Sequence, residues 1–348
     1  MNINVLGYGL IFVLIIGCAS HGDKEEVKKK VELIQQKSPV TNSIRGISIV
    51  DSNIIWLSGA KGSILQTTDG GENWQLLLSP DGDSLDFRSI QAFNKNEAII
   101  ASAGFPARIY KTINAGKKWE LVYENHDSAA FMNSIAFKNE QEGIVIGDQL
   151  QGRHLLLKTK DGGVNWQRID SINVPKPLEN ENGFAASGSC IAINASGEYF
   201  IGLGGGNSRV FSSVEGERWE VTESKLETDK TSSGIYSIAS GATFLMAVGG
   251  DYTEVDSTHH AAISKNGKNW SMTKGVLSGY RSVVDYSETC DCWLVGGTNG
   301  IEISYDNGDS WEQISDQNVN TLRFVPQSTS AFMANSNGQI YLFRLIRV

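Results

Sequence analysis

The sequence of 348 residues contains no stripe of basic side chains, and its 30 Lys and Arg are outnumbered by 39 Asp and Glu. A nucleic-acid partner is therefore not expected, because proteins that hold a phosphate backbone gather their cations on one face. Also absent are a strong nucleophile motif, a phosphate-binding glycine loop and a dinucleotide fingerprint. The sequence thus indicates no cofactor, and it contains no metal motif with a recognisable ligand spacing.

Proline and cysteine are both scarce, at 6 and 4 residues, whereas glycine is abundant, at 37. Abundant glycine with little proline is expected of a chain that makes many hairpin turns. Cys190 stands in an apolar stretch and is predicted to be a small core residue. Cys290 and Cys292 lie at a predicted turn, where they could pair or form part of a metal or redox site. The sequence leaves that choice open.

One apolar run, residues 3–16, precedes Gly17, Cys18 and Ala19. A run this short that ends in small residues is typical of a signal peptide and not of a membrane span. Ile15-Ile16-Gly17-Cys18 resembles a bacterial lipobox, which implies cleavage before Cys18 and lipid attachment to its thiol. The alternative is a simple secretory signal with an incidental cysteine.

These features divide the chain into a signal peptide (1–17), a charged tether (18–30) and one large domain (31–348). Ala19 is not the aspartate that retains lipoproteins at an inner membrane. We therefore expect a lipid-anchored protein of the cell envelope, on the outer membrane where the host has one.

An eight-residue sequence motif, called the phrase below, recurs along the large domain and ends in tryptophan. Its close copies are Thr67–Trp74, Thr112–Trp119, Thr159–Trp166 and Ser304–Trp311. Two degraded copies, ending at Trp219 and Trp270, stand between the third and the last. Regular recurrence at this spacing is the signature of a radial repeat architecture.

Each phrase has the chemistry of a hairpin turn. An Asp or Asn caps the following backbone N–H groups, and a glycine supplies the positive φ of the reversal. The capping positions are Asp69, Asn114, Asp161 and Asp306. The phrase resembles the Asp-box (BNR) repeat, S/T-x-D-x-G-x-x-W, of sialidases and other propellers. The resemblance implies that these side chains are structural staples, away from any catalytic face.

Four short strands precede or follow each phrase, which is the strand number of a propeller blade. First strands open at seven residues: Arg45, Arg88, Asn133, Ser189, Tyr236, Arg281 and Asn320. The last repeat ends without a fourth strand, and Val31–Gln35 offers the missing one. The sequence therefore predicts an all-β, seven-bladed propeller, closed where Val31–Gln35 pairs with Gln339–Leu345.

This arrangement resembles the seven-bladed Asp-box propellers of the photosystem II stability/assembly factor family. The resemblance covers about residues 31–348 and lies in the repeat, not in a shared active site. What it implies is the architecture and a non-catalytic scaffolding role.

Function in propellers tends to lie where loops vary, here the face opposite the Asp boxes. On that face Arg45, Arg88 and Arg281, with Asn320, are predicted to line one side of the channel mouth. Guanidinium groups suit capture of a carboxylate or phosphate. The alternative is that they pair with loop acids, for which Asp83, Asp86 and Asp285 are the candidates.

The loop of residues 251–260 concentrates acids and histidines. Such side chains can bind a divalent cation, but their spacing matches no metal motif, so a solvated loop is favoured and no metal is predicted.

Together these features favour a monomeric, lipid-anchored, non-catalytic module that binds or assembles an envelope protein or glycan. The alternative is a sialidase-like glycoside hydrolase, which needs an arginine cluster and paired acids. The Phe/Tyr-Arg-Ile-Pro start motif of sialidases is absent from the sequence, and seven blades exceed the six of that family.

Overall fold

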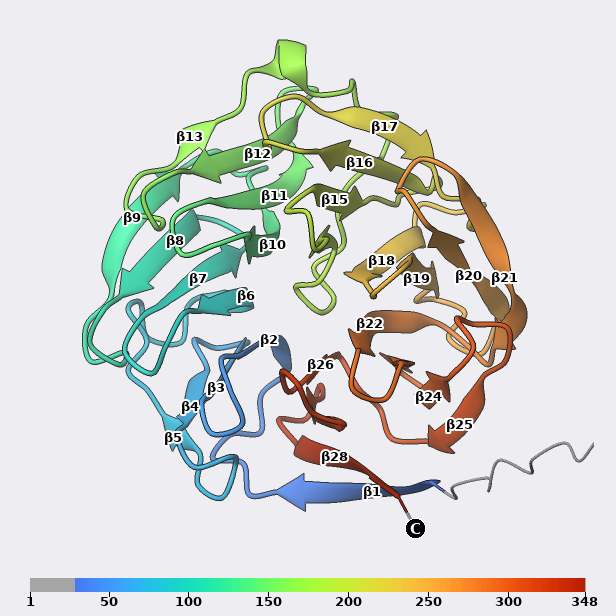
Figure 1. The fold of residues 1–348 in the computed structure, drawn as a ribbon. Coiled ribbons are helices and arrows are strands. Elements are labelled where there is room, and N and C mark those ends of the chain that lie inside the picture. Colours follow the sequence, from blue (N-terminus) through green and yellow to red (C-terminus); the bar gives the residue numbers. More distant parts are fainter. Residues whose placement is uncertain (1–28, 348) are drawn as a thin grey trace, which may run out of the picture.

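The computed structural model describes residues 29–347, which form a ring of seven four-stranded antiparallel sheets (Figure 1). This confirms the predicted all-β, seven-bladed propeller. The helical element of this range is the single 3₁₀ turn η1 (Ser171–Asn173). The predicted signal peptide, Cys18 and most of the predicted tether lie outside the described residues. Within residues 29–347, no helix has the length and apolar character needed to cross a membrane.

Blades 1 to 3 use consecutive strands, each blade running from the channel outward. Blade 1 consists of β2 (Ile44–Ile49), β3 (Ile55–Gly59), β4 (Ile64–Thr67) and β5 (Gln75–Leu76). Blade 2 consists of β6 (Asp86–Ala92), β7 (Ala98–Ala103), β8 (Ala107–Thr112) and β9 (Glu120–Asn125). Blade 3 consists of β10 (Met132–Phe137), β11 (Gly143–Gln149), β12 (His154–Thr159) and β13 (Gln167–Arg168).

Blades 4 to 6 repeat the same order. Blade 4 consists of β14 (Ile191–Ile193), β15 (Tyr199–Gly202), β16 (Arg209–Ser213) and β17 (Glu220–Glu223). Blade 5 consists of β18 (Ser233–Ser240), β19 (Leu245–Asp251), β20 (His259–Ser264) and β21 (Trp270–Leu277). Blade 6 consists of β22 (Arg281–Ser287), β23 (Cys292–Gly297), β24 (Gly300–Ser304) and β25 (Glu312–Ser315).

Blade 7 joins the two ends of the domain. Its inner strands are β26 (Thr321–Phe324), β27 (Ser330–Ala334) and β28 (Ile340–Arg347), and its outer strand is β1 (Lys29–Gln36). β1 pairs antiparallel with β28 over its whole length, with Val31 opposite Leu345 and Gln35 opposite Tyr341. This pairing confirms closure by the N-terminal strand, which covers an edge that would otherwise be open.

The apolar core lies between neighbouring blades and not in one central mass. Ile47 and Leu57 of blade 1 pack with Phe332 of blade 7, while Trp56 of blade 1 packs with Ile100 of blade 2. Because both faces of each inner strand are covered in this way, these strands are apolar with little alternation.

The Asp boxes form the predicted turns. Asp69 accepts hydrogen bonds from the Asn73 backbone N–H (2.9 Å) and side-chain amide (2.8 Å), and Thr67 accepts one from the Gly71 N–H (3.0 Å). Glycines 70 and 71 adopt φ of 73° and 89°. The boxes of Asn114, Asp161 and Asp306 repeat the backbone contact made four residues ahead.

The cysteines take two roles. Cys190 is fully buried, as predicted for a core residue. Cys290 and Cys292, which the sequence left undecided, form a disulfide at the turn before β23.

Candidate functional site

The candidate site lies at the mouth, which we define as the end of the central channel where the first strands begin. Five first strands start with a one-residue β-bulge, at Arg45, Arg88, Asn133, Tyr236 and Ser282. A bulge leaves its residue outside the regular ladder and re-aims its side chain. These five positions are therefore equivalent around the ring.

A segment of blade 4 occupies the mouth. Residues 182–189, here called the plug, lead into β14 and lie in the middle of the ring (Figure 1). Most of the plug is buried, including Ala185, Ala186 and Ser187. Gly188 adopts φ of 65° and comes so close to blade 2 that a Cβ there would lie 2.6 Å from the Arg88 carbonyl oxygen. Only glycine fits this approach.

The plug is hydrogen-bonded to the first strands of blades 1, 3, 6 and 7. Its Gly183 carbonyl accepts from Asn133 of blade 3 (2.9 Å) and its Ala186 carbonyl accepts from Arg45 of blade 1 (3.0 Å). Ser187 donates to the carbonyl of Ser282 in blade 6 (2.8 Å) and accepts from Thr321 of blade 7 (3.3 Å). These bonds hold the plug within the mouth.

Arg45 and Arg88 come together beside the plug. Burial, and then the charge of Arg88, lower the pKa of Arg45 from its usual value. Arg88 donates to Asp86 (2.7 Å), and its guanidinium lies over the ring of Phe131, 5.8 Å from the centroid. Asp86 is thus the loop acid that the sequence suggested for Arg88, whereas Arg45 is held by a neutral carbonyl. Two adjacent cations with one carboxylate leave positive charge for an incoming anion.

Aromatic side chains line the mouth beside these arginines. Phe184 of the plug stacks on Tyr236, with ring centroids 3.9 Å apart, and Tyr280 meets Tyr236 edge-on at 4.7 Å. Tyr252 approaches the same ring at 6.5 Å and keeps 55% of its surface exposed. The sequence reasoning missed this cluster, because its members come from four separate segments.

Arg281 does not line the mouth. It is fully buried, and its guanidinium donates to Glu302 (2.8 Å from Nε), to Asn299 (2.6 Å) and to the Tyr280 carbonyl (3.0 Å). Each of its three nitrogens donates at least one hydrogen bond to the protein. Arg281 therefore has a structural role within blade 6 and is not available to a ligand at the mouth.

The register explains this placement. In blade 6 the bulge falls at Ser282, since Arg281 pairs with Gly297 and Val283 with Gly296. In blade 1 the bulge falls at Arg45, because Ile44 pairs with Gly59 and Gly46 with Ser58. Arg281 is thus equivalent to buried Ile44 and not to Arg45, one residue from the register that the sequence suggested.

Asn320 is also committed to the ring. Its side-chain amide donates to the Ile44 carbonyl (3.0 Å) and to Ser43 (3.2 Å), so it joins blade 7 to blade 1. The predicted set of Arg45, Arg88, Arg281 and Asn320 thus brings only its first two members together as a cationic pair.

The Asp-box carboxylates are occupied by their turns. Hydrogen bonds from Asn73 and Thr67 lower the pKa of Asp69 to about 2. Asp251, in the acidic loop, accepts from Thr253 (2.7 Å) and pairs with Lys230. Among residues 29–347, no three His, Cys, Asp or Glu side chains gather in a way that would hold a metal ion.

Comparison with known proteins identifies related sequences. The family described as "Photosynthesis system II assembly factor YCF48" matches residues 25–128. The "Photosystem II assembly lipoprotein Ycf48" of Picosynechococcus is 25% identical over 74% of this chain and 69% of that protein. The lipoprotein of the same name from Trichormus variabilis is 28% identical over 75% and 70%. The "Photosystem II assembly protein Ycf48" of Thermosynechococcus vestitus is 24% identical over 79% and 73%.

Two solved structures share the fold. A chain described as "YCF48 bound to D1 peptide" superposes with a TM-score of 0.64 at 21% identity, covering 90% of this chain and 96% of that one. YCF48 from Cyanidioschyzon merolae gives the same TM-score at 18% identity, covering 90% and 98%. The chain is therefore an Asp-box propeller that resembles the photosystem II assembly factor propellers.

Proposed function

We propose that this chain is a lipid-anchored, non-catalytic assembly module that holds an extended segment of a client protein at its mouth. The observation that carries the proposal is the pairing of Arg45 with Arg88 beside the plug, next to a partly exposed aromatic cluster. Cations and aromatic rings together suit a peptide with a carboxylate and apolar side chains.

The similar proteins support a protein client over a glycan. The relatives are named as photosystem II assembly proteins, and the solved structure with the same fold is described as bound to a D1 peptide. For this chain the client is defined by its chemistry alone: an extended segment that ends in, or carries, a carboxylate. Two relatives are named lipoproteins, which supports lipid attachment at Cys18. The proposed place on an envelope membrane, the outer one where present, rests on the sequence around Cys18 and Ala19.

Photo-crosslinking in the native membrane tests this function. A photoreactive phenylalanine at Tyr252, which lies exposed beside the mouth, is expected to capture a client, and mass spectrometry should map the crosslink to a terminal or acidic segment. Replacing both arginines, R45Q/R88Q, should abolish that crosslink. A photoreactive residue at Leu76, exposed on the outer strand of blade 1, is the matched control. Equal crosslinking from both positions, or capture that survives R45Q/R88Q, would contradict the proposal.

A further inference from the structure

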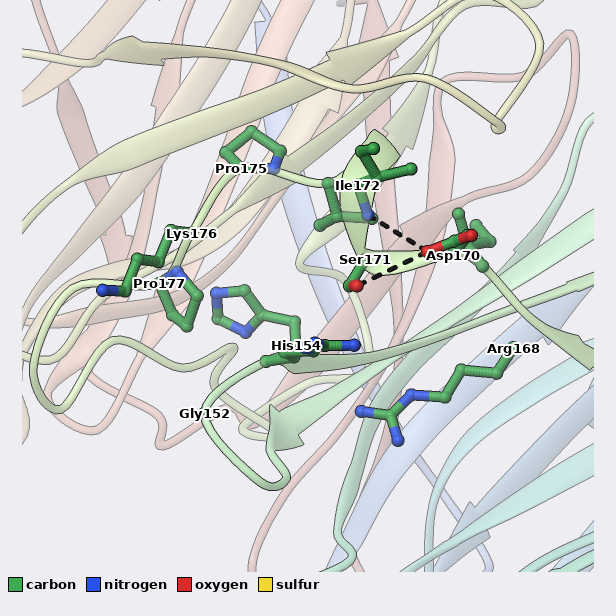
Figure 2. A pocket seen from close by; sticks show the side chains of 12 residues that line it. Gly152, His154, Arg168, Asp170, Ser171, Ile172, Pro175, Lys176 and Pro177 are labelled. Carbon is green, nitrogen blue, oxygen red and sulfur yellow. Dashed lines mark hydrogen bonds between the residues drawn. The ribbon is translucent and has the colours of Figure 1, made fainter.

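A cavity of ≈ 660 Å³ lies at the rim of the ring, away from the mouth. Its walls are the turn between β11 and β12 and the connection from blade 3 to blade 4 (Figure 2). Arg153, Arg168 and Lys176 contribute cations to this cavity, and Ile172, Pro175 and Pro177 contribute apolar surface. The two kinds of side chain are interleaved around one opening.

A second cavity, of ≈ 290 Å³, adjoins the first through Arg168, Ile169 and Asp170. It continues past Gln167 towards Lys160 and the Asp box of Asp161. We call the two cavities together the edge groove, because they follow β13, the outermost strand of blade 3. An edge strand presents unpaired backbone groups along its free side.

Three cations of the larger cavity lack acidic partners, whereas Lys158 and Lys160 of the smaller cavity pair with Glu217. Among residues 29–347, no carboxylate lies within ion-pair distance of Arg153, Arg168 or Lys176, and Arg168 donates only to the Leu150 carbonyl (3.2 Å). The acid of the larger cavity, Asp170, accepts hydrogen bonds from the N–H of Ile172 (3.2 Å) and the hydroxyl of Ser171 (3.4 Å), so the opening holds three cations against one carboxylate. In a chain of net charge −9, three unpaired cations at one opening form a positive site.

The wall of the groove is held in place from behind. Buried Glu181 accepts from Arg209 (2.6 Å at Nε) and lies 3.3 Å from His154, while Arg209 also donates to the Lys176 carbonyl (3.0 Å). The carbonyl of Asn173, the last residue of η1, accepts from the backbone N–H of Trp219 (2.9 Å). His154 Nδ1, at the cavity wall, is buried and has no hydrogen-bond partner among the described residues. The site is thus preformed.

An apolar side chain stands exposed beside these charges. Ile172 is 86% exposed on η1, and Leu178, just beyond the cavity wall, is 46% exposed. Exposed large apolar residues next to unpaired cations mark an interaction surface. Cations and apolar side chains interleaved around one elongated opening fit an extended chain with alternating side chains better than they fit a single small anion.

We propose that the edge groove binds an extended acidic peptide segment of a partner protein. Its Asp or Glu side chains pair with Arg153, Arg168 and Lys176, and its apolar side chains cover Ile172 and the two prolines. This site is separate from the mouth and does not depend on the function proposed there. Planar guanidinium groups can each hold a carboxylate through two hydrogen bonds, which gives the groove its preference for carboxylates.

Fluorescence anisotropy with a defined probe tests the proposal. The probe is a fluorescein-labelled nine-residue peptide that alternates Glu with Leu and Val and has both ends blocked, so that side chains supply its only carboxylates. It should bind the parent protein, and the R153Q/R168Q variant should bind it at least tenfold more weakly. Arg218→Gln, which removes an exposed and unpaired arginine from blade 4, is the matched control and should bind like the parent. Circular dichroism and thermal unfolding establish that each variant is folded.

A charge-reversed pair provides a second readout. R153E/R168E should lose the acidic peptide and gain a peptide with Lys in place of Glu. The proposal is overturned when the parent does not bind the acidic peptide, when R153Q/R168Q binds it unchanged, or when a Gln-substituted peptide binds equally. Loss of the peptide in R45Q/R88Q alone would locate it at the mouth, and binding of phosphatidylglycerol vesicles without the peptide would assign the groove to a membrane surface.

Discussion

Arg281 and Glu302 form a buried ion pair whose role is structural. Arg281 is fully buried and Glu302 nearly so, and both guanidinium nitrogens Nε and Nη2 donate to the same carboxylate oxygen. Ser278 donates its backbone N–H to Glu302 as well (3.2 Å). Such a pair is costly to desolvate, and its partners are interdependent, because removal of one leaves the other charged and unsolvated.

Replacing Glu302 by Gln should therefore destabilise the protein strongly. We expect the free energy of unfolding to fall by about 3–5 kcal/mol, the range for breaking a buried pair on one side only. Urea unfolding followed by tryptophan fluorescence measures this change. Asp86→Asn, which breaks the partly exposed pair with Arg88, is the control and should cost under about 1 kcal/mol. An E302Q variant as stable as the parent would contradict the structural role.

Glu181 predicts a pH dependence of stability. Burial raises the pKa of Glu181, but hydrogen bonds from Arg209 and His154 more than offset this, so the pKa lies below its usual value. A carboxyl whose pKa is lower in the folded than in the unfolded state stabilises the fold above the unfolded pKa, about 4.3. That stabilisation is lost as the pH falls below this value through the folded pKa.

The stability difference between the parent and Glu181→Gln should therefore shrink as the pH is lowered from 5 to 3. Urea unfolding at intervals of half a pH unit measures the difference. Glu179→Gln, at an exposed acid two residues away, is the control and should show no such trend. A difference that stays constant or grows over this range would mean that Glu181 is not held as a carboxylate by Arg209 and His154.

At the scale of single residues, the sequence predicts hydrogen bonds within a turn better than it predicts how one strand is aligned with its neighbour. Asp69 and Asp306 could be assigned to turns because all their hydrogen bonds fall within four residues of the chain. Arg281 could not be separated from Arg45 and Arg88, since all three precede an apolar residue by two positions. The difference is the place of a bulge, which depends on pairing with the neighbouring strand.

At the scale of elements, β1 completes blade 7 through both hydrogen bonds and packing. Val31 and Leu33 pack against the core between blades 6 and 7, and Ile34 packs against the core between blades 7 and 1. The side chains of β1 thus contribute to the packing of blade 7 against both of its neighbours, blades 6 and 1. The sequence predicted this pairing because the last repeat lacks a fourth strand. The observed strand extends the predicted Val31–Gln35 by two residues at its N-terminal end and by one at its C-terminal end.

A chain that begins at Ser43 should accordingly lose much of its stability. Without β1, the outer edge of β28 opens and three apolar side chains leave two cores. We expect the melting temperature to fall by roughly 10 °C or more, or the protein to aggregate, because an unpaired edge is a template for association. Differential scanning calorimetry and size-exclusion chromatography measure both outcomes.

A synthetic peptide of residues 29–42 gives the control for this truncation. When added to the truncated chain, it should restore the melting temperature in a concentration-dependent way, since strand addition recovers the lost pairs. A truncated chain that melts with the parent, or that ignores the peptide, would show that closure does not depend on β1.

At the scale of the whole molecule, the blades cohere mainly as neighbours, and the plug adds contacts across the ring. The apolar clusters described above each join two adjacent blades, as in other repeat proteins. The plug differs, because it bonds Arg45 at a sequence separation of 141 and Thr321 at 134. Contacts this distant leave no local pattern, so the sequence revealed seven blades but not what fills the mouth.

This arrangement predicts that a substitution in the plug weakens the first strands of blades that are distant from it in sequence. The double substitution F184A/S187A removes the stack on Tyr236 of blade 5 and the hydrogen bond to the Ser282 carbonyl of blade 6, with an expected cost of roughly 2–4 kcal/mol. Hydrogen exchange followed by mass spectrometry should then show faster exchange in β2, β10, β22 and β26. Ile172→Ala, in the same connection but 86% exposed, is the control and should leave those strands protected. Faster exchange confined to blade 4 would mean that the plug fills the channel without joining the ring, and the arginines of the mouth would then owe their position to their own strands.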